Sequence, residues 1–243
     1  MKKKRYKPFY KNFLKLRENI QNRPKVFKFK KKKWSQFQFF AKKKLKFFKR
    51  YKIKDQFKLV VSRFRYHSQK NSFKKRFKNI MLERKLFSFF YGILKKKYLK
   101  THLKQSFSKN LKNISNFNTY KHNALKFFES RLDTVLHRSK FSFSIKNADQ
   151  LILHGHILVN GKVIRTKSYI LKTNDLVEVT PSVKSRALIK KNIDRSNFWP
   201  IPQKYLIVNY NTLQILFILN ENNILPLFDH YLNVNSLFLN IKK

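Results

Sequence analysis

One segment of the chain, residues 129–180, has an ordinary composition and sets the firmest limit on the fold. Its first part carries an apolar stripe at helical spacing, which predicts a short helix with Leu132, Val135 and Leu136 inside. A second helix is predicted from near Ser144 to Gly155, since Ser is a favoured N-cap and Gly ends helices. Its expected core stripe consists of Ile145, Ala148, Leu151 and Ile152.

A hairpin is predicted directly after the second helix. Asn160-Gly161 stands between two β-rich runs, residues 157–159 and 163–165. Asn-Gly is the strongest short hairpin signal, because a type I′ turn needs positive φ at both central positions. A further turn at residues 173–175 precedes an expected strand at 176–179. The segment therefore predicts two amphipathic helices, a hairpin and one more strand.

Polar residues at the start of the first helix suggest how it is capped. Ser130 is expected to cap this helix, with Asp133 three residues later in a pattern close to a capping box. Asp133 then reads as a cap or first-turn acid. Arg131 and Arg138 fall on other helix faces, where we expect them to stay exposed to solvent or to a partner.

The charge of the chain points to a polyanionic partner. Lys and Arg total 58 against 11 acids, a formal net charge of +47. Residues 1–120 hold 40 of the basic residues but only 3 of the acids. A compact chain of this charge repels itself strongly, and binding through phosphates is expected to weaken steeply with salt.

Several site classes find no support in the sequence. The chain has no cysteine, which excludes disulfides and Cys-based zinc sites. His154 and His156 have no carboxylate or Cys neighbour, so no metal is expected, and the three glycines read as turns or caps rather than a nucleotide loop. No apolar run reaches the length of a membrane span, and no secretory signal or cofactor motif is expected.

Outside this segment the chain divides by composition. Residues 1–79 mix lysine runs with aromatic residues, which predicts a basic RNA-penetrating arm that orders on its partner. The alternative is a solvated extension whose Phe residues reflect AT-rich codons. Residues 80–128 are expected to be helical, with a break at Gly92 and a loop at 105–119. Residues 181–243 predict a basic linker, with Lys184, Arg186, Lys190 and Lys191, and an apolar tail with strands near 205–209 and 213–219.

At this point a resemblance can be named. The pattern ESRLDTVLHRSKF…LILHGHILVNGKVI…SYILKTNDLVEV closely resembles the RNA-binding domain named after ribosomal protein S-four. The flanks LERKLFSFFYGILKKKYLK and KYLIVNYNTLQILFI are similar to those of the ribosomal protein family itself. The resemblance implies an α+β fold, in which a helical, basic N-terminal body joined by the C-terminal tail accompanies a small two-helix and hairpin domain. The expected divisions are 1–79, 80–128, 129–180 and 181–243.

The resemblance also implies which residues contact RNA. Many family members carry two arginines on the second helix, where this chain has Ile145 and Asp149, with Lys146 as a partial substitute. Lys140 stands where the family has Gly and adds a phosphate contact. The expected RNA-binding residues are Arg131, Arg138, Lys140, Lys146, His154, His156, Lys162, Arg165 and Lys167.

These observations together predict a structural, non-enzymatic constituent of a small ribosomal subunit. The expected partners are small-subunit rRNA and neighbouring ribosomal proteins, with mRNA as a further candidate near its entry side. AT-rich codon usage favours an organelle gene and a mitochondrial location. The alternatives are a free RNA chaperone or RNA-modification factor, a DNA-compacting protein, and a modifying enzyme that uses Asp133.

Overall fold

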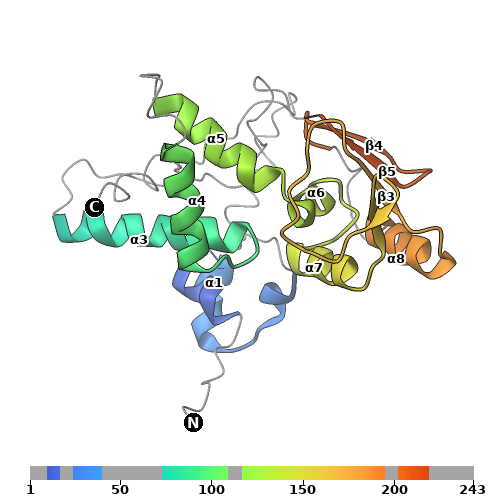
Figure 1. Cartoon of the computed structure of the whole chain (residues 1–243). Coiled ribbons are helices and arrows are strands. Elements are labelled where there is room, and N and C mark those ends of the chain that lie inside the picture. Colours follow the sequence, from blue (N-terminus) through green and yellow to red (C-terminus); the bar gives the residue numbers. More distant parts are fainter. Residues whose placement is uncertain (1–9, 17–23, 40–72, 109–116, 195–201, 219–243) are drawn as a thin grey trace, which may run out of the picture. The chain divides into compact units, whose positions relative to one another are not determined.

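The computed structural model describes residues 10–16, 24–39, 73–108, 117–194 and 202–218 (Figure 1). The chain divides into two compact units, with a boundary between Phe90 and Tyr91. None of the helices in these described ranges is both long and apolar enough to cross a membrane.

The N-terminal unit contains ordered helices in a region expected to be an arm. It comprises α1 (Lys11–Leu16), the 3₁₀ helix η1 (Pro24–Lys28), helical residues 32–39, and α3 (Phe73–Phe90). Phe13 of α1 is fully buried, and its ring meets the edge of Phe89 of α3 at 5.3 Å. Residues 10–16 and 24–39 of the expected arm are thus folded in the absence of a partner, because their aromatic rings pack on one another. That the arm orders fully only on a partner stays a prediction. Residues 40–72 lie outside the described residues.

The second unit begins with a sharp turn and two helices. Gly92 has φ +82 just past the end of α3, as predicted for a helix break. The helices α4 (Lys96–Ser108) and α5 (Phe117–Glu129) follow, so the predicted loop is wrong for residues 105–108 and 117–119, which are helical. Residues 109–116 lie outside the described residues. The apolar residues Ala124, Leu125 and Phe128 of α5 are buried.

The two helices predicted in the central segment are both present. They are α6 (Leu132–Arg138) and α7 (Ile145–Leu153). Ser144 caps α7 by accepting a hydrogen bond from the Asn147 N–H, and the whole predicted stripe of α7 is buried. The predicted cap of α6 is wrong, because the Ser130 hydroxyl donates instead to the Phe127 carbonyl. The N-cap is Arg131, which has no capping side chain, and Asp133 sits in the first turn.

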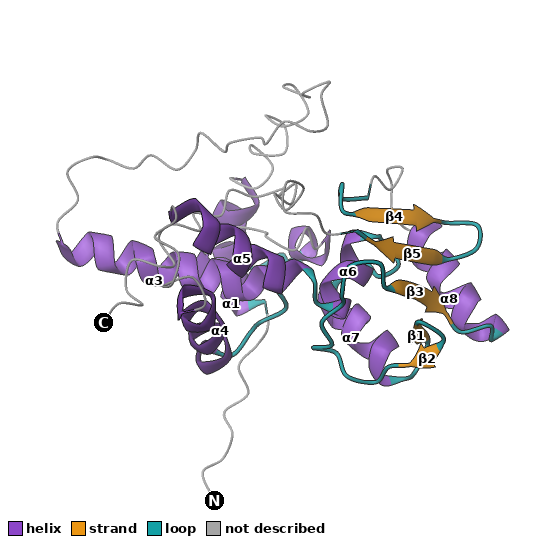
Figure 2. Cartoon of the chain, turned by 45° about the horizontal axis from the view of Figure 1, so that its top comes forward, coloured by secondary structure: helices purple, strands orange, loops and turns teal. Residues whose placement is uncertain are grey.

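Five antiparallel strands form a single sheet in the order β2-β1-β3-β5-β4 (Figure 2). The predicted hairpin joins β1 (Ile157–Val159) to β2 (Lys162–Val163), with φ 49 at Asn160 and 77 at Gly161. The predicted third strand is β3 (Leu176–Val179). The two strands expected in the tail are β4 (Leu206–Asn209) and β5 (Gln214–Phe217), and β5 pairs with β3. The central sheet thus extends beyond the expected boundary at residue 180.

The expected basic linker is in fact a helix. Residues Val183–Asp194 form α8. Near its start, Ser185 Oγ lies 2.8 Å from His156 Nδ1, just past the end of α7. Near its end, Asn192 donates to the Phe141 carbonyl at 3.0 Å and to Asn147 Oδ1 at 3.3 Å, at the beginning of α7. The two helices therefore lie side by side in opposite directions.

Gly92 offers a direct stability test of the turn before α4. A Cβ at this position would lie 2.7 Å from Ile145 Cγ2, whereas a Cβ at Gly161 meets nothing within 4 Å. Both glycines have positive φ, so an alanine at either adds backbone strain of about 1 kcal/mol or more. We expect Gly92→Ala to lower the free energy of unfolding more than Gly161→Ala does, because only Gly92→Ala adds a clash. Equal losses in urea unfolding would contradict this packing.

Candidate nucleic-acid interface

A buried carboxylate lies at the centre of the second unit. Glu129 is 0% exposed and accepts hydrogen bonds from the hydroxyls of Tyr91, at 2.6 Å, and Tyr205, at 2.5 Å. Arg138 donates to both carboxylate oxygens through Nε and Nη2, each at 3.1 Å. Four donors from three separate parts of the chain thus compensate the burial of one charge, as a desolvated carboxylate requires.

The surroundings of Glu129 set the protonation of its partners. Burial raises the pKa of the Tyr91 and Tyr205 hydroxyls well above 10.0, and the Glu129 charge raises both further. Burial alone would lower the pKa of the Arg138 guanidinium, but the Glu129 carboxylate outweighs it and raises that pKa above its usual value. The two phenols therefore stay neutral, and the Arg138 guanidinium stays charged.

A second buried ion pair occupies the start of α6. Arg131 is 4% exposed and donates to Asp133 through Nε at 3.0 Å and Nη2 at 2.5 Å. Its guanidinium lies 5.5 Å from the centre of the Tyr98 ring on α4. Asp133 Oδ1 also accepts the Thr134 backbone N–H at 2.8 Å. Asp133 is thus committed to a helix start and an ion pair, and it is not exposed to a substrate.

The expectation that Arg131 and Arg138 face solvent is therefore wrong. Both guanidinium groups are buried, and each is engaged by a carboxylate. Helical spacing put both arginines outside the apolar stripe, which led to the expectation of exposure. A buried arginine that pairs with an acid can have the same spacing, so the sequence did not separate the two cases. We assign both residues to holding the fold.

Five other predicted contacts have exposed side chains: Lys140, Lys146, Lys162, Arg165 and Lys167. Residues 162–167 lie beside the second half of α7. Lys167 Nζ is 3.7 Å from Asp149 Oδ2, and Arg165 Nε is 3.7 Å from the position of a Cβ on Gly155. The hairpin and the loop after it therefore bring their cations to the α7 helix.

Ile145 and Asp149, which stand on α7 where arginines were expected from the resemblance, have different surroundings. Ile145 is 6% exposed and fills the space beside Gly92, where a longer charged side chain has no room. Asp149 is half-buried, and burial followed by the Asp133 charge raises the pKa of its carboxyl. Its Oδ1 has no hydrogen-bond partner. Neither position supplies a cation, which leaves Lys146 as the basic residue near the start of α7.

The two histidines near the end of α7 differ from one another. His154 is exposed, whereas His156 is half-buried with Nδ1 held 2.8 Å from Ser185 Oγ. Their ring centres are 6.1 Å apart. No group of three or more His, Cys, Asp or Glu side chains able to hold a metal occurs among the described residues.

The sequence analysis missed the basic helix α8. Its buried residues, Ser185, Ile189 and Asn192, recur at helical spacing, but two of them are polar and hide the pattern. The exposed side carries four cations that were assigned to a linker: Lys184, Arg186, Lys190 and Lys191. These exposed cations lie on a helix that is hydrogen-bonded to the α7 region through Ser185 and Asn192.

The buried pair predicts unequal costs for two neighbouring substitutions. Arg138→Met removes the partner of a fully buried carboxylate and should cost about 3–5 kcal/mol of unfolding free energy. Lys140→Met, two residues away, changes an exposed cation and should cost little. Urea unfolding of both variants measures the difference, and similar small losses would show that the pair is not stabilising.

The two tyrosines predict a pH dependence. A phenol whose pKa is raised in the folded state stabilises the fold fully below its unfolded pKa, and that stability falls as pH rises above about 10. Tyr91→Phe should lower stability at neutral pH, because Glu129 loses a donor, and should also reduce the alkaline fall. Unfolding free energies at about pH 8 and about pH 11 test this. A fall that is unchanged in the Tyr91→Phe/Tyr205→Phe double variant would exclude these hydroxyls as its source.

Comparisons with known proteins agree with this arrangement. Residues 130–177 match the family model of the S4 domain. The small ribosomal subunit protein uS4 of Aquifex aeolicus is 31% identical over 122 residues, which are 50% of this chain and 54% of that protein. The uS4 protein of Mycoplasma capricolum is 33% identical over 142 residues, 58% of this chain and 63% of that protein. The protein uS4c of Ceratophyllum demersum is 40% identical over 79 residues, 32% of this chain and 39% of that protein.

The first of these relatives is matched over about half its length. The S4-domain match, residues 130–177, includes the buried Arg131–Asp133 pair and the exposed cations from Lys140 to Lys167. The chain thus contains an S4 domain and is similar to uS4 proteins over part of their length.

Proposed function

We propose that this protein is a non-enzymatic structural constituent of a small ribosomal subunit that binds small-subunit rRNA. The observation that carries the proposal is an S4 domain whose cations divide into two kinds. Arg131 and Arg138 form buried ion pairs, whereas the lysines around α7 and Arg165 are exposed. Exposed cations on a rigid frame position a protein on phosphates without reading base sequence.

The proposed RNA surface combines two groups of exposed cations. The first, the hairpin group, comprises Lys146, Lys162, Arg165 and Lys167. The second, the α8 group, comprises Lys184, Arg186, Lys190 and Lys191. Because α8 lies along α7, the second group supplies charge beside the helix whose family arginines are absent. Folded RNA is recognised mainly by shape and backbone contacts, which suits such a surface.

Finer features of the proposal extend beyond the S4 domain. We place the protein in a mitochondrion, encoded by the organelle, with neighbouring ribosomal proteins and mRNA near its entry side as further partners. The AT-rich codon signature of the sequence supports this location. The basic face of α4, with exposed Lys96, Lys97 and Lys100, adds phosphate contacts outside the S4 domain. The expected packing of the C-terminal tail on the helical region concerns residues 219–243, which lie outside the described residues.

The hairpin group predicts a specific loss of RNA binding. The Arg165→Gln/Lys167→Gln double variant should weaken binding to folded small-subunit rRNA and reduce the slope of log affinity against log salt by about one unit or more. Its thermal stability should stay near that of the parent, because both side chains are exposed. Filter binding at several salt concentrations measures affinity and slope together.

A matched control is Thr166→Gln, which alters the same exposed segment without changing charge. It should retain the parental salt slope. A double variant that binds with the parental affinity and slope would remove the hairpin group from the interface. Binding to double-stranded DNA with equal affinity and slope would instead favour a general polyanion binder.

A further inference from the structure

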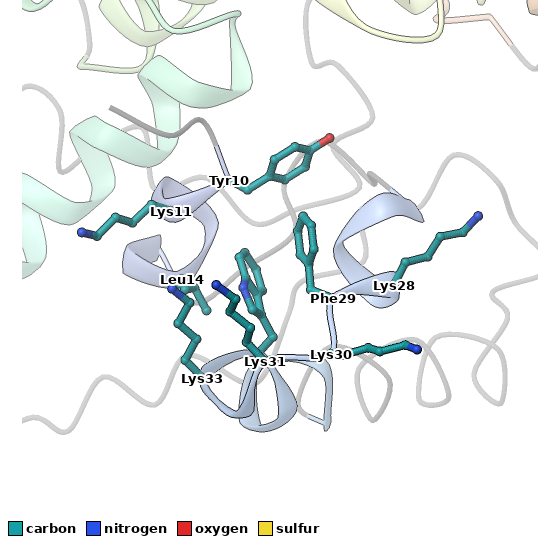
Figure 3. Close-up of a pocket in the computed structure, with 9 residues that line it drawn as sticks. Tyr10, Lys11, Leu14, Lys28, Phe29, Lys30, Lys31 and Lys33 are labelled. Atoms are coloured by element: carbon teal, nitrogen blue, oxygen red, sulfur yellow. The ribbon is translucent and has the colours of Figure 1, made fainter. Parts of the chain in front are cut away.

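The N-terminal unit contains a hollow that lies outside the S4 domain. It has a volume of about 520 Å³ and is lined by residues of α1, of η1 and of the chain up to Trp34 (Figure 3). Three of the lining residues are aromatic, namely Tyr10, Phe29 and Trp34, and five are lysines. This volume is within the range of about 300–1,000 Å³ that small-molecule sites occupy.

The aromatic rings form a continuous, partly open wall. Phe29 meets the Tyr10 ring edge-on at 5.1 Å and lies 4.7 Å from the Trp34 ring. Trp34 is 5% exposed, whereas Tyr10 and Phe29 are only half-buried. Rings that served only as a core would be buried throughout. Here part of the aromatic surface faces the hollow, as Figure 3 shows for Tyr10 and Phe29.

A side-chain amide holds the wall in place. Gln38 Nε2 donates to the Phe29 carbonyl at 2.8 Å and to the Val26 carbonyl at 3.1 Å. These bonds tie helical residues 32–39 to the end of η1, so Phe29 is fixed relative to Trp34. The hollow is therefore formed before any ligand binds.

The rim of the hollow is cationic. Lys11, Lys28 and Lys30 have exposed side chains, which point outward from the rings in Figure 3. No acidic residue occurs in the described stretches 10–16 and 24–39. An aromatic wall alone would suit an apolar ligand, and lysines alone would suit any polyanion. The two together match a planar base joined to phosphates.

We propose that this hollow binds one unpaired nucleotide of RNA. The base lies against Phe29 and Tyr10, while the lysines at the rim neutralise the phosphates on either side. The inference rests on the proposed rRNA-binding function and adds a second contact point in a different unit from the S4 domain. Trp34, in the same wall, reports occupancy through its fluorescence.

The test uses the full chain with Trp199→Phe, which leaves Trp34 as its single tryptophan. The probe is a single-stranded oligoadenylate of about ten nucleotides, compared with an abasic strand of the same length. We expect the oligoadenylate to quench Trp34 and to bind more tightly than the abasic strand. Equal binding and equal quenching by the abasic strand would overturn the proposal, because phosphate contacts alone would then account for it.

Two pairs of variants locate the contact. Phe29→Leu keeps an apolar side chain but removes the ring, and it should weaken oligoadenylate binding about five-fold or more. Its control is Phe39→Leu, which changes a 64% exposed ring that does not line the hollow. Lys30→Gln should also weaken binding, whereas Lys15→Gln, on α1 but away from the lining, should do so less. Equal effects within both pairs would overturn the proposal.

Binding of the same variants to folded small-subunit rRNA separates this inference from the proposed function. A chain that binds this rRNA selectively but shows no base-dependent quenching of Trp34 would overturn the nucleotide site alone. A chain that fails to bind the rRNA selectively would overturn the proposed function, whether or not it binds the oligoadenylate.

Discussion

The architecture of the second unit depends on one buried carboxylate. Glu129, at the end of α5, receives hydrogen bonds from Tyr91, Arg138 and Tyr205, which precede α4, end α6 and precede β4. Burying a carboxylate is unfavourable unless its oxygens accept hydrogen bonds. Removing any one of these donors should therefore lower the free energy of unfolding. The S4 helices are thereby fixed to the preceding helices and to the strands that extend the sheet. An interface built on this frame keeps its cations in a defined arrangement.

The same ion pairs account for the charged groups inside the domain. Arg131 forms an ion pair with Asp133, and Arg138 forms one with Glu129. The attraction within each pair is stronger because water is excluded from it. The remaining cations of the domain lie at its surface, on the hairpin, on α7 and on α8. Burial thus divides the charged groups into those that hold the fold and those that remain exposed. Composition alone does not distinguish the two.

Local signals predicted much of this fold, and contacts between distant residues account for what they missed. Ser144, Asn160-Gly161 and Gly155 act through their own backbone neighbours, so the α7 cap, the hairpin and the helix end were predictable. Glu129 and Tyr205 are brought together only by the tertiary fold, so the burial of Arg138 was not. The helix α8 was missed because Ser185 and Asn192 interrupt its buried stripe, and their hydrogen bonds to the α7 region replace apolar packing. The ordered aromatic cluster near Trp34 was obscured by the surrounding lysine runs.

The central proposal is that the protein is part of a small ribosomal subunit. Sucrose-gradient sedimentation at high magnesium, with the tagged full chain followed by immunoblotting, tests it most directly. The account predicts that the protein migrates with small-subunit rRNA and moves to light fractions after RNase treatment. A protein that stays at the top of the gradient while intact small subunits sediment below would contradict the account, and would favour a free RNA-binding factor.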